Sequence, residues 1–146
     1  NVIIEYNSKF EDKVKKFLVD ICVGEFGFNS WKDELENQKI CEYKQNGGNF
    51  WIAIDNDENI IGTIALKNLG ENKGYLKSMY VDSNYRGSKI AKNLMDTLLD
   101  YAISNQYKSI ELGTYTCLER AVAFYKKNKF ELKEQDGDIL IFERKI

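Results

Sequence analysis

The chain contains no histidine and no proline, and only three of its 146 residues are cysteine. Without histidine, nucleophilic catalysis by a Ser–His or Cys–His pair is excluded, and the commonest zinc ligand is missing. We therefore expect no metal site. Any proton transfer falls to carboxylates, tyrosine, lysine, cysteine or water.

The cysteines, Cys22, Cys41 and Cys117, are odd in number and form no Cys-x-x-Cys pair, which indicates free thiols in a reducing compartment. No signal peptide is visible, and no apolar run approaches the roughly 18 residues of a membrane span. The sequence thus predicts a cytoplasmic protein without a membrane partner. Cys117 without a histidine is better interpreted as an inert thiol than as an acyl carrier.

Charge and length give two further predictions. The 21 basic and 23 acidic residues are interspersed, so no basic surface of the kind that binds nucleic acid is expected. Neither a Gly/Ser-rich linker nor an internal repeat divides the chain, and its length suits one core. We expect a single domain over residues 1–146, without a nucleic-acid partner. A homodimer is compatible with the sequence.

Hydrophobic patterning predicts a mixed α+β fold with a central sheet. Seven runs are typical of β-strands: Val2–Tyr6, Phe50–Asp55, Asn59–Leu66, Tyr75–Val81, Ser109–Thr114, Phe130–Leu132 and Ile139–Arg144. Four stretches have helical spacing: one from a Ser8–Glu11 capping box through Ile21, Trp31–Gln38, Lys89 through Ile103, and Leu118–Lys127. Tight turns are expected at residues 56–58 and at Asp136-Gly137.

The segment Tyr85–Ala91 constrains function most, because an arginine and a glycine lie there between a strand and the longest helix. A strand that turns directly into a helix leaves several backbone N–H groups unpaired, and such groups bind phosphate oxygens. Alone, the same residues describe an ordinary surface turn with a helix cap equally well.

The stretch Leu76–Leu99 resembles the coenzyme-binding core of the GNAT superfamily of acyltransferases. In that family a strand ending in Val is followed by Arg/Gln-x-x-Gly-x-Gly/Ala and a helix. Val81, Arg86 and Ala91 match this pattern, whereas Lys89 stands where the family usually has glycine. Lysine there either adds a charge near the phosphates or obstructs them with its Cβ.

This resemblance implies acetyl-CoA as co-substrate. Its pyrophosphate would bind the loop, and its pantetheine arm would pair with the strand backbone as an added strand does. The implied coenzyme-binding residues are Met79, Tyr80, Val81, Arg86, Gly87, Ser88, Lys89, Ile90, Ala91 and Lys92. Alternatively, Met79, Tyr80 and Val81 only pack in the hydrophobic core.

A second motif, Ala121–Phe130, resembles the family's C-terminal Ala-x-x-x-Tyr followed by Gly-Phe. Tyr125 falls on the tyrosine, while Lys129 replaces the glycine and Leu118 stands where asparagine is common. The resemblance covers essentially the whole chain. It implies a mostly antiparallel sheet of about seven strands, splayed between the fourth and fifth, with about four flanking helices.

The resemblance also implies the chemistry, transfer of an acetyl group from a thioester to a primary amine by direct attack in a ternary complex. Tyr125 is the candidate acid that protonates the leaving thiolate. The base is either Glu111, on the strand bordering the splay, or a water relay. The alternative function is a catalytically silent acyl-CoA-binding or regulatory module.

The acceptor is expected to bind in the segment after the first helix, which lines the acceptor cleft in GNAT relatives. There Phe26, Phe28 and Trp31 lie near Glu25 and Glu34, a combination that suits a cationic amine. Alternatively the aromatics pack this segment on the sheet. A polyamine, an amino acid, an aminoglycoside-like compound and a protein amine all remain open.

Overall fold

A computed structural model describes all 146 residues and contains one seven-stranded sheet in the order β1-β2-β3-β4-β5-β7-β6. The strands are β1 (Val2–Glu5), β2 (Asn49–Ile54), β3 (Ile60–Gly70), β4 (Lys73–Val81), β5 (Ser109–Tyr115), β6 (Glu131–Asp136) and β7 (Ile139–Lys145). Every neighbouring pair is antiparallel except β4 and β5. The predicted seven-stranded, mostly antiparallel sheet is confirmed.

Five α-helices flank the sheet: α1 (Glu11–Val19), α2 (Lys32–Asn37), α3 (Glu42–Gln45), α4 (Ile90–Ser104) and α5 (Glu119–Lys127). A π-helical turn, η2 (Asp20–Glu25), continues α1. Helix α3 was not predicted, because four residues are too few to display a helical period. No helix has the length and apolar character needed to span a bilayer.

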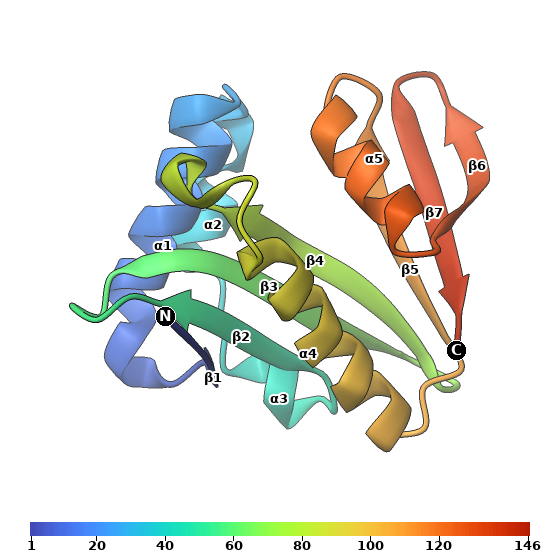
Figure 1. Ribbon diagram of the computed structural model, residues 1–146, viewed down its shortest axis with the longest axis horizontal. Helices are drawn as coiled ribbons and strands as arrows, with labels where there is room; N and C mark the ends of the chain where they lie inside the picture. Colours follow the sequence, from blue (N-terminus) through green and yellow to red (C-terminus); the bar gives the residue numbers. More distant parts are fainter.

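The sheet opens between β4 and β5. These strands pair only at their beginnings, where Lys73, Gly74 and Tyr75 meet residues 109–111. Beyond Tyr75 the β5-facing edge of β4 has no strand partner, and the two strands diverge into the V seen in Figure 1. The predicted splay between the fourth and fifth strands is confirmed.

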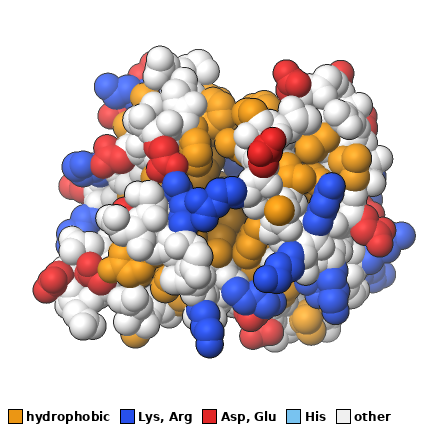
Figure 2. Space-filling view, turned by 45° about the horizontal axis from the view of Figure 1, so that its top comes forward, with side chains coloured by type: hydrophobic (Ala, Val, Ile, Leu, Met, Phe, Trp, Pro, Cys, Tyr) orange, Lys and Arg blue, Asp and Glu red, His pale blue; other side chains and the backbone are white.

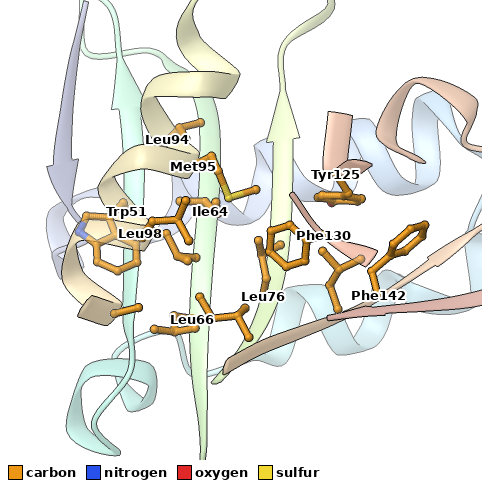
Figure 3. Close-up of a cluster of buried hydrophobic side chains, with 14 of the residues drawn as sticks. Trp51, Ile64, Leu66, Leu76, Leu94, Met95, Leu98, Tyr125, Phe130 and Phe142 are labelled. Carbon is orange, nitrogen blue, oxygen red and sulfur yellow. The ribbon is translucent and has the colours of Figure 1, made fainter. Parts of the chain in front are cut away.

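Hydrophobic cores cover both faces of the sheet. On one face, Leu94, Met95 and Leu98 of α4 pack on a cluster that includes Trp51 (Figure 3). On the other face, residues of α1 pack in a second cluster that includes Ile52. Successive β2 residues thus point into different cores, which is why all six are buried and the strand is a continuous apolar run.

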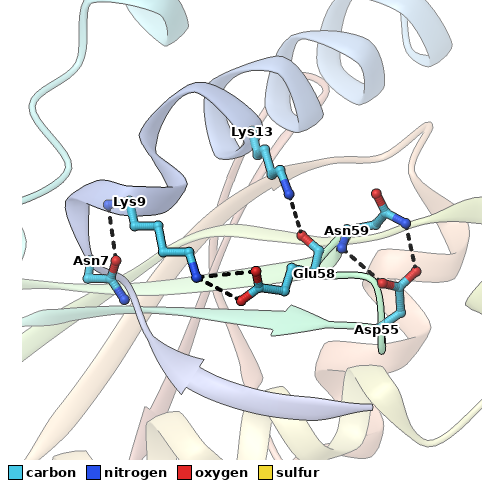
Figure 4. Close-up of polar contacts among 6 residues, drawn as sticks. All are labelled: Asn7, Lys9, Lys13, Asp55, Glu58 and Asn59. Atoms are coloured by element: carbon cyan, nitrogen blue, oxygen red, sulfur yellow. Dashed lines mark hydrogen bonds and ion pairs between the residues drawn. The ribbon is translucent and has the colours of Figure 1, made fainter.

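The N-terminal helix is capped one residue earlier than predicted. Asn7 accepts a hydrogen bond from the Lys9 amide at 3.0 Å, Ser8 lies in a 3₁₀ turn, and α1 begins only at Glu11 (Figure 4). The predicted Ser8–Glu11 capping box is therefore wrong. Asn7 takes the role because its backbone is extended, as an N-cap requires.

The turn between β2 and β3 is tied to α1 and to the 3₁₀ turn that precedes it. Lys9 Nζ pairs with the Glu58 carboxylate at 3.0 Å, and Lys13 Nζ donates to the Glu58 carbonyl at 3.1 Å (Figure 4). Asp55 accepts two bonds from Asn59, through its backbone N–H at 2.9 Å and its side chain at 3.0 Å. These bonds hold the pKa of Asp55 below its usual range. The predicted tight turn is confirmed.

The next hairpin is longer than predicted. The sequence indicated a strand ending at Leu66, but β3 continues to Gly70 and β4 begins at Lys73. Glu71 and Asn72 connect them with φ of 55° and 62°, the positive values of a type I′ turn. The extension was missed because residues 67–70 are all exposed and show no apolar alternation.

Candidate functional site

The loop before α4 has the free donors expected of an anion site. Four amide N–H groups between residues 87 and 92 have no acceptor in the protein: those of Gly87, Lys89, Ala91 and Lys92. The fifteen-residue helix that follows directs the positive end of its dipole toward them. Gly87 has φ +83°, so glycine is needed for this turn.

The side chain of Arg86 is already engaged. Its guanidinium makes a bidentate pair with Glu25 at 2.5 and 2.9 Å, and its Nε donates to the Val81 carbonyl at 3.1 Å. It also lies 5.8 Å from the centre of the Phe26 ring. Arg86 therefore braces the loop against the end of η2, and this pair joins residues 61 positions apart in sequence.

Lys89 has an ordinary right-handed conformation, with φ −80° and ψ 0°. Its backbone therefore does not require the glycine that the family usually has there. By contrast Lys129, which replaces the second family glycine, has φ +68°, where an L-residue is strained. Lys129 therefore has a strained backbone conformation, whereas Lys89 does not.

At the splayed edge, the side chains of residues 79–81 point alternately to the two faces of the sheet. Met79 packs toward the α4 core and Tyr80 toward the α1 core. Just before them, Ser78 has φ +54° in a β-bulge, and its carbonyl accepts the Thr63 hydroxyl at 2.6 Å. Such a bulge re-aims the following residues, and nothing in the sequence signalled it.

A furrow runs between the two parts of the molecule that carry α1 and α5. Hydrophobic side chains are exposed at its base, and Lys and Arg side chains gather around its lower end (Figure 2). An apolar groove with basic side chains beside it suits a long ligand that ends in phosphates.

Tyr125 of α5 lies between that helix and β4, beside Phe130 (Figure 3). Its side chain is buried, yet its hydroxyl has no hydrogen-bond partner in the protein. No fully buried polar side-chain atom lacks a partner, so this hydroxyl must reach open space. Burial, reinforced by nearby Tyr75, raises the pKa of Tyr125 well above its ordinary value. The phenol thus keeps its proton at neutral pH.

A cleft of about 560 Å³ lies on the sheet face that carries α2 and α3. Its lining includes Tyr75, Ser78 and Tyr80 of β4 and Gly113 of β5, so it extends to the splay. Charged residues border it as well: Glu34, Lys39, Glu42, Lys67 and Lys77. The cleft is therefore polar and open to a charged acceptor.

Of the three predicted acceptor residues, only Trp31 lines this cleft. Phe28 stacks on Trp31 with ring centres 4.4 Å apart and packs on Tyr115 at 5.6 Å. Phe26 lies against the guanidinium of Arg86. Phe26 and Phe28 therefore support the segment, as the packing alternative predicts.

Glu111 does not line the cleft. Its carboxylate pairs with Lys133 Nζ at 3.3 Å, an interaction that raises the pKa of this lysine. The geometry therefore favours a surface strand residue over the predicted base. The lysines of the cleft and Tyr75 were missed, and Tyr80 was predicted only as a coenzyme-binding residue, because strand periodicity alone does not say which face borders a cavity.

Comparison with known proteins agrees with this architecture. The sequence profile of the Acetyltransferase (GNAT) family matches residues 15–130. A GNAT-family acetyltransferase from Staphylococcus aureus Mu50 is 33% identical, with a TM-score of 0.88 over 99% of this chain and 98% of that chain. A paia N-acetyltransferase from Thermoplasma acidophilum, solved with coenzyme A, is 22% identical, with a TM-score of 0.85 over the same shares.

Among curated proteins, the N-acetylaspartate synthetase of Xenopus tropicalis is 39% identical over 89 residues, which are 60% of this chain and 32% of that protein. Human N-acetyltransferase 8 is 30% identical over 92 residues, 60% of this chain and 40% of the relative. The chain thus matches about a third of the length of these relatives. By its sequence profile and its fold, the chain belongs to the acetyltransferase (GNAT) family.

Proposed function

We propose that the protein transfers the acetyl group of acetyl-CoA to a primary amine by direct attack in a ternary complex. The observation that carries the proposal is the protonated, unpartnered phenol of Tyr125 beside the splay. An anion-suited loop approaches the splay from one side and a polar cleft from the other. Membership of an acetyltransferase family supports acetyl-CoA as the co-substrate.

The chain's own residues fit this co-substrate. We expect the free amides between Gly87 and Lys92 to bind the pyrophosphate, with Lys89 adding an exposed positive charge. The unpaired edge of β4 from Met79 to Val81 offers backbone groups to the pantetheine amides. Arg86 would act by holding the loop in place.

In the chemical step, the neutral amine nitrogen attacks the thioester carbonyl carbon, so that a C–N bond forms and the C–S bond breaks. Tyr125 gives its proton to the leaving sulfur and recovers one from solvent. Burial that raises the pKa of the phenol also raises that of a thiol in the same place, so the thiolate remains a good proton acceptor. Since Glu111 is paired elsewhere, we assign the amine proton to water in the cleft.

The acceptor amine is to be identified by a screen of candidate amines. Relatives named N-acetylaspartate synthetase bring amines that carry carboxylates into the panel. Polyamines, aminoglycosides and peptide amines complete it. A homodimer and a cytoplasmic location stay predictions.

The test is incubation with acetyl-CoA and the amine panel, with released thiol followed by absorbance and acetylated product by mass spectrometry. We expect thiol release that requires one class of amine. Tight acetyl-CoA binding without thiol release for any amine would instead favour the catalytically silent acyl-CoA-binding module.

A further inference from the structure

We propose that the acceptor is a small amine bearing carboxylates, an amino-acid-type substrate, and that Lys67 and Lys77 bind its carboxylates. This inference rests on the proposed function and deepens it by naming the substrate class. Both lysines line the cleft, one on β3 and one on β4.

The strand register puts the two ammonium groups on one face. Lys77 lies opposite Ala65, and Lys67 lies opposite Tyr75, two residues later on β3 and two residues earlier on β4. Diagonal neighbours of this kind are about 7–8 Å apart at the backbone, within reach of long side chains. Lys67 and Lys77 can therefore converge on a single carboxylate or bind two on the same molecule.

Neither of these lysines has a counter-ion, unlike Lys9, Lys44 and Lys92, which pair with carboxylates at 2.6–3.0 Å. Other surface lysines, Lys73 among them, are also unpaired, so what distinguishes Lys67 and Lys77 is that they lie unpaired side by side on one sheet face within the cleft. Lys67 and Lys77 have no such partner, although like charges side by side on a sheet face are destabilising. An anion in the cleft relieves this repulsion.

The position of Lys77 also orients the acceptor. It directly precedes Ser78 at the bulge, where β4 turns into the splayed edge. A carboxylate held by Lys77 leaves an amine a few atoms away free to point toward Tyr80 and the gap beside Tyr125. Lys77 is only half exposed, so its charge is less screened than that of a fully exposed lysine.

Glu34 and Glu42 border the cleft from α2 and α3 and would favour a different acceptor, a polycation. A polycation would be drawn to them but repelled by the lysines on the β3–β4 floor. The lysines stand on the two strands that lead to the splay, whereas the glutamates stand on the short helices α2 and α3 that border the cleft. The lysines are therefore expected to decide which acceptor reaches the site of transfer.

The experiment compares amines that differ only in one charge: aspartate with asparagine, glutamate with glutamine, and glycine with glycinamide, beside the diamine putrescine. We expect kcat/KM to be highest for the dicarboxylates and lowest for putrescine. Turnover that is equal across each pair, or fastest with putrescine, would overturn the inference while leaving the proposed function intact.

Substitution of each lysine tests whether it binds the carboxylate. Lys77→Met keeps most of the apolar stem, and it should raise KM for aspartate roughly tenfold, the effect of one charge-assisted hydrogen bond, with kcat and the KM for glycinamide, which has no carboxylate, little changed. Lys67→Met should act in the same direction. Lys73→Met is the matched control, since Lys73 lies on the same strand and outside the cleft. An unchanged KM for aspartate in both cleft variants would refute the assignment.

Binding is measured separately by calorimetry, with aspartate titrated into the protein saturated with coenzyme A. Binding that is lost in Lys77→Met but kept in Lys73→Met supports the carboxylate site even if no amine is acetylated, in which case only the proposed function fails. Absence of binding together with absence of turnover overturns both.

Discussion

The two sides of β4 are built in different ways. On the α4 side, the loop offers four free backbone N–H groups within six consecutive residues, 87–92. On the other side, the cleft is made by side chains from α2, α3, β3 and β4. A site made of consecutive backbone groups leaves a short motif in the sequence, whereas a site made of distant side chains does not. This is why the donor side was predicted in detail and the acceptor side only in part.

Tyr125 is the proposed proton donor to the leaving thiolate, so its substitution should have the largest effect. Tyr125→Phe keeps the ring but removes the proton donor, and we expect kcat to fall by ~10²–10⁴ while acetyl-CoA affinity is kept. Stopped-flow turnover and calorimetry measure the two quantities. Tyr101→Phe is the control, since the Tyr101 hydroxyl bonds to the Gly48 carbonyl at 3.0 Å, away from the splay. Wild-type kcat in the Tyr125 variant would reduce Tyr125 to a packing residue.

The pH profile tests whether the acceptor side lacks a base. With water as proton acceptor, only the neutral amine reacts, so kcat/KM should rise about tenfold per pH unit up to the pKa of the amine. Because burial raises the pKa of Tyr125, no decline is expected below about pH 10, the pKa of an ordinary tyrosine. Glu111→Gln should leave the profile unchanged. A plateau reached near neutral pH would reveal a protein base.

The ion pair between Arg86 and Glu25 holds the loop against η2, and substituting either residue removes it. Because Arg86 is bound to Glu25 and to the Val81 carbonyl, Arg86→Ala should loosen the loop and weaken acetyl-CoA binding by about tenfold. Glu25→Gln should weaken it in the same direction but less. If Glu25→Gln instead tightens binding in calorimetry, the freed guanidinium contacts the phosphates directly.

The smallest effects concern the two lysines that replace family glycines. Lys129→Gly should raise the free energy of unfolding by ~0.5–1 kcal/mol, because φ +68° is strained for lysine. Lys89→Gly should lower it by up to about 1 kcal/mol, because the φ of −80° suits lysine and glycine costs backbone entropy. Urea denaturation measures both, and equal signs would contradict the conformational argument.

Lys89→Gly also tests charge on the donor side. The exposed Lys89 ammonium should contribute to acetyl-CoA binding, more at low salt where screening is weak. We therefore expect weaker binding in the glycine variant and a smaller dependence on salt. Tighter binding would show that the lysine side chain obstructs the phosphates.

Local chemistry was sufficient for much of the fold. Strand runs, the spacing of Leu94, Met95 and Leu98, and the turn at Gly137 all carry signals within a few residues. Elements without such a signal were predicted too short or were not predicted. β6 was predicted only to Leu132, because all six residues of Glu131–Asp136 are exposed and show no apolar period.

The sequence by itself determined the order of the strands and of the longer helices, the loop of free amides before α4 and the position of Tyr125 on α5, because these depend on neighbouring residues. Only the tertiary structure decided that Glu25 occupies Arg86, that Lys133 occupies Glu111, and that the lysines of β3 and β4 share one cleft. Those contacts join residues far apart in the chain, and the shared cleft of the two lysines also depends on the register of β3 and β4 and on a bulge at Ser78 that no local pattern encodes.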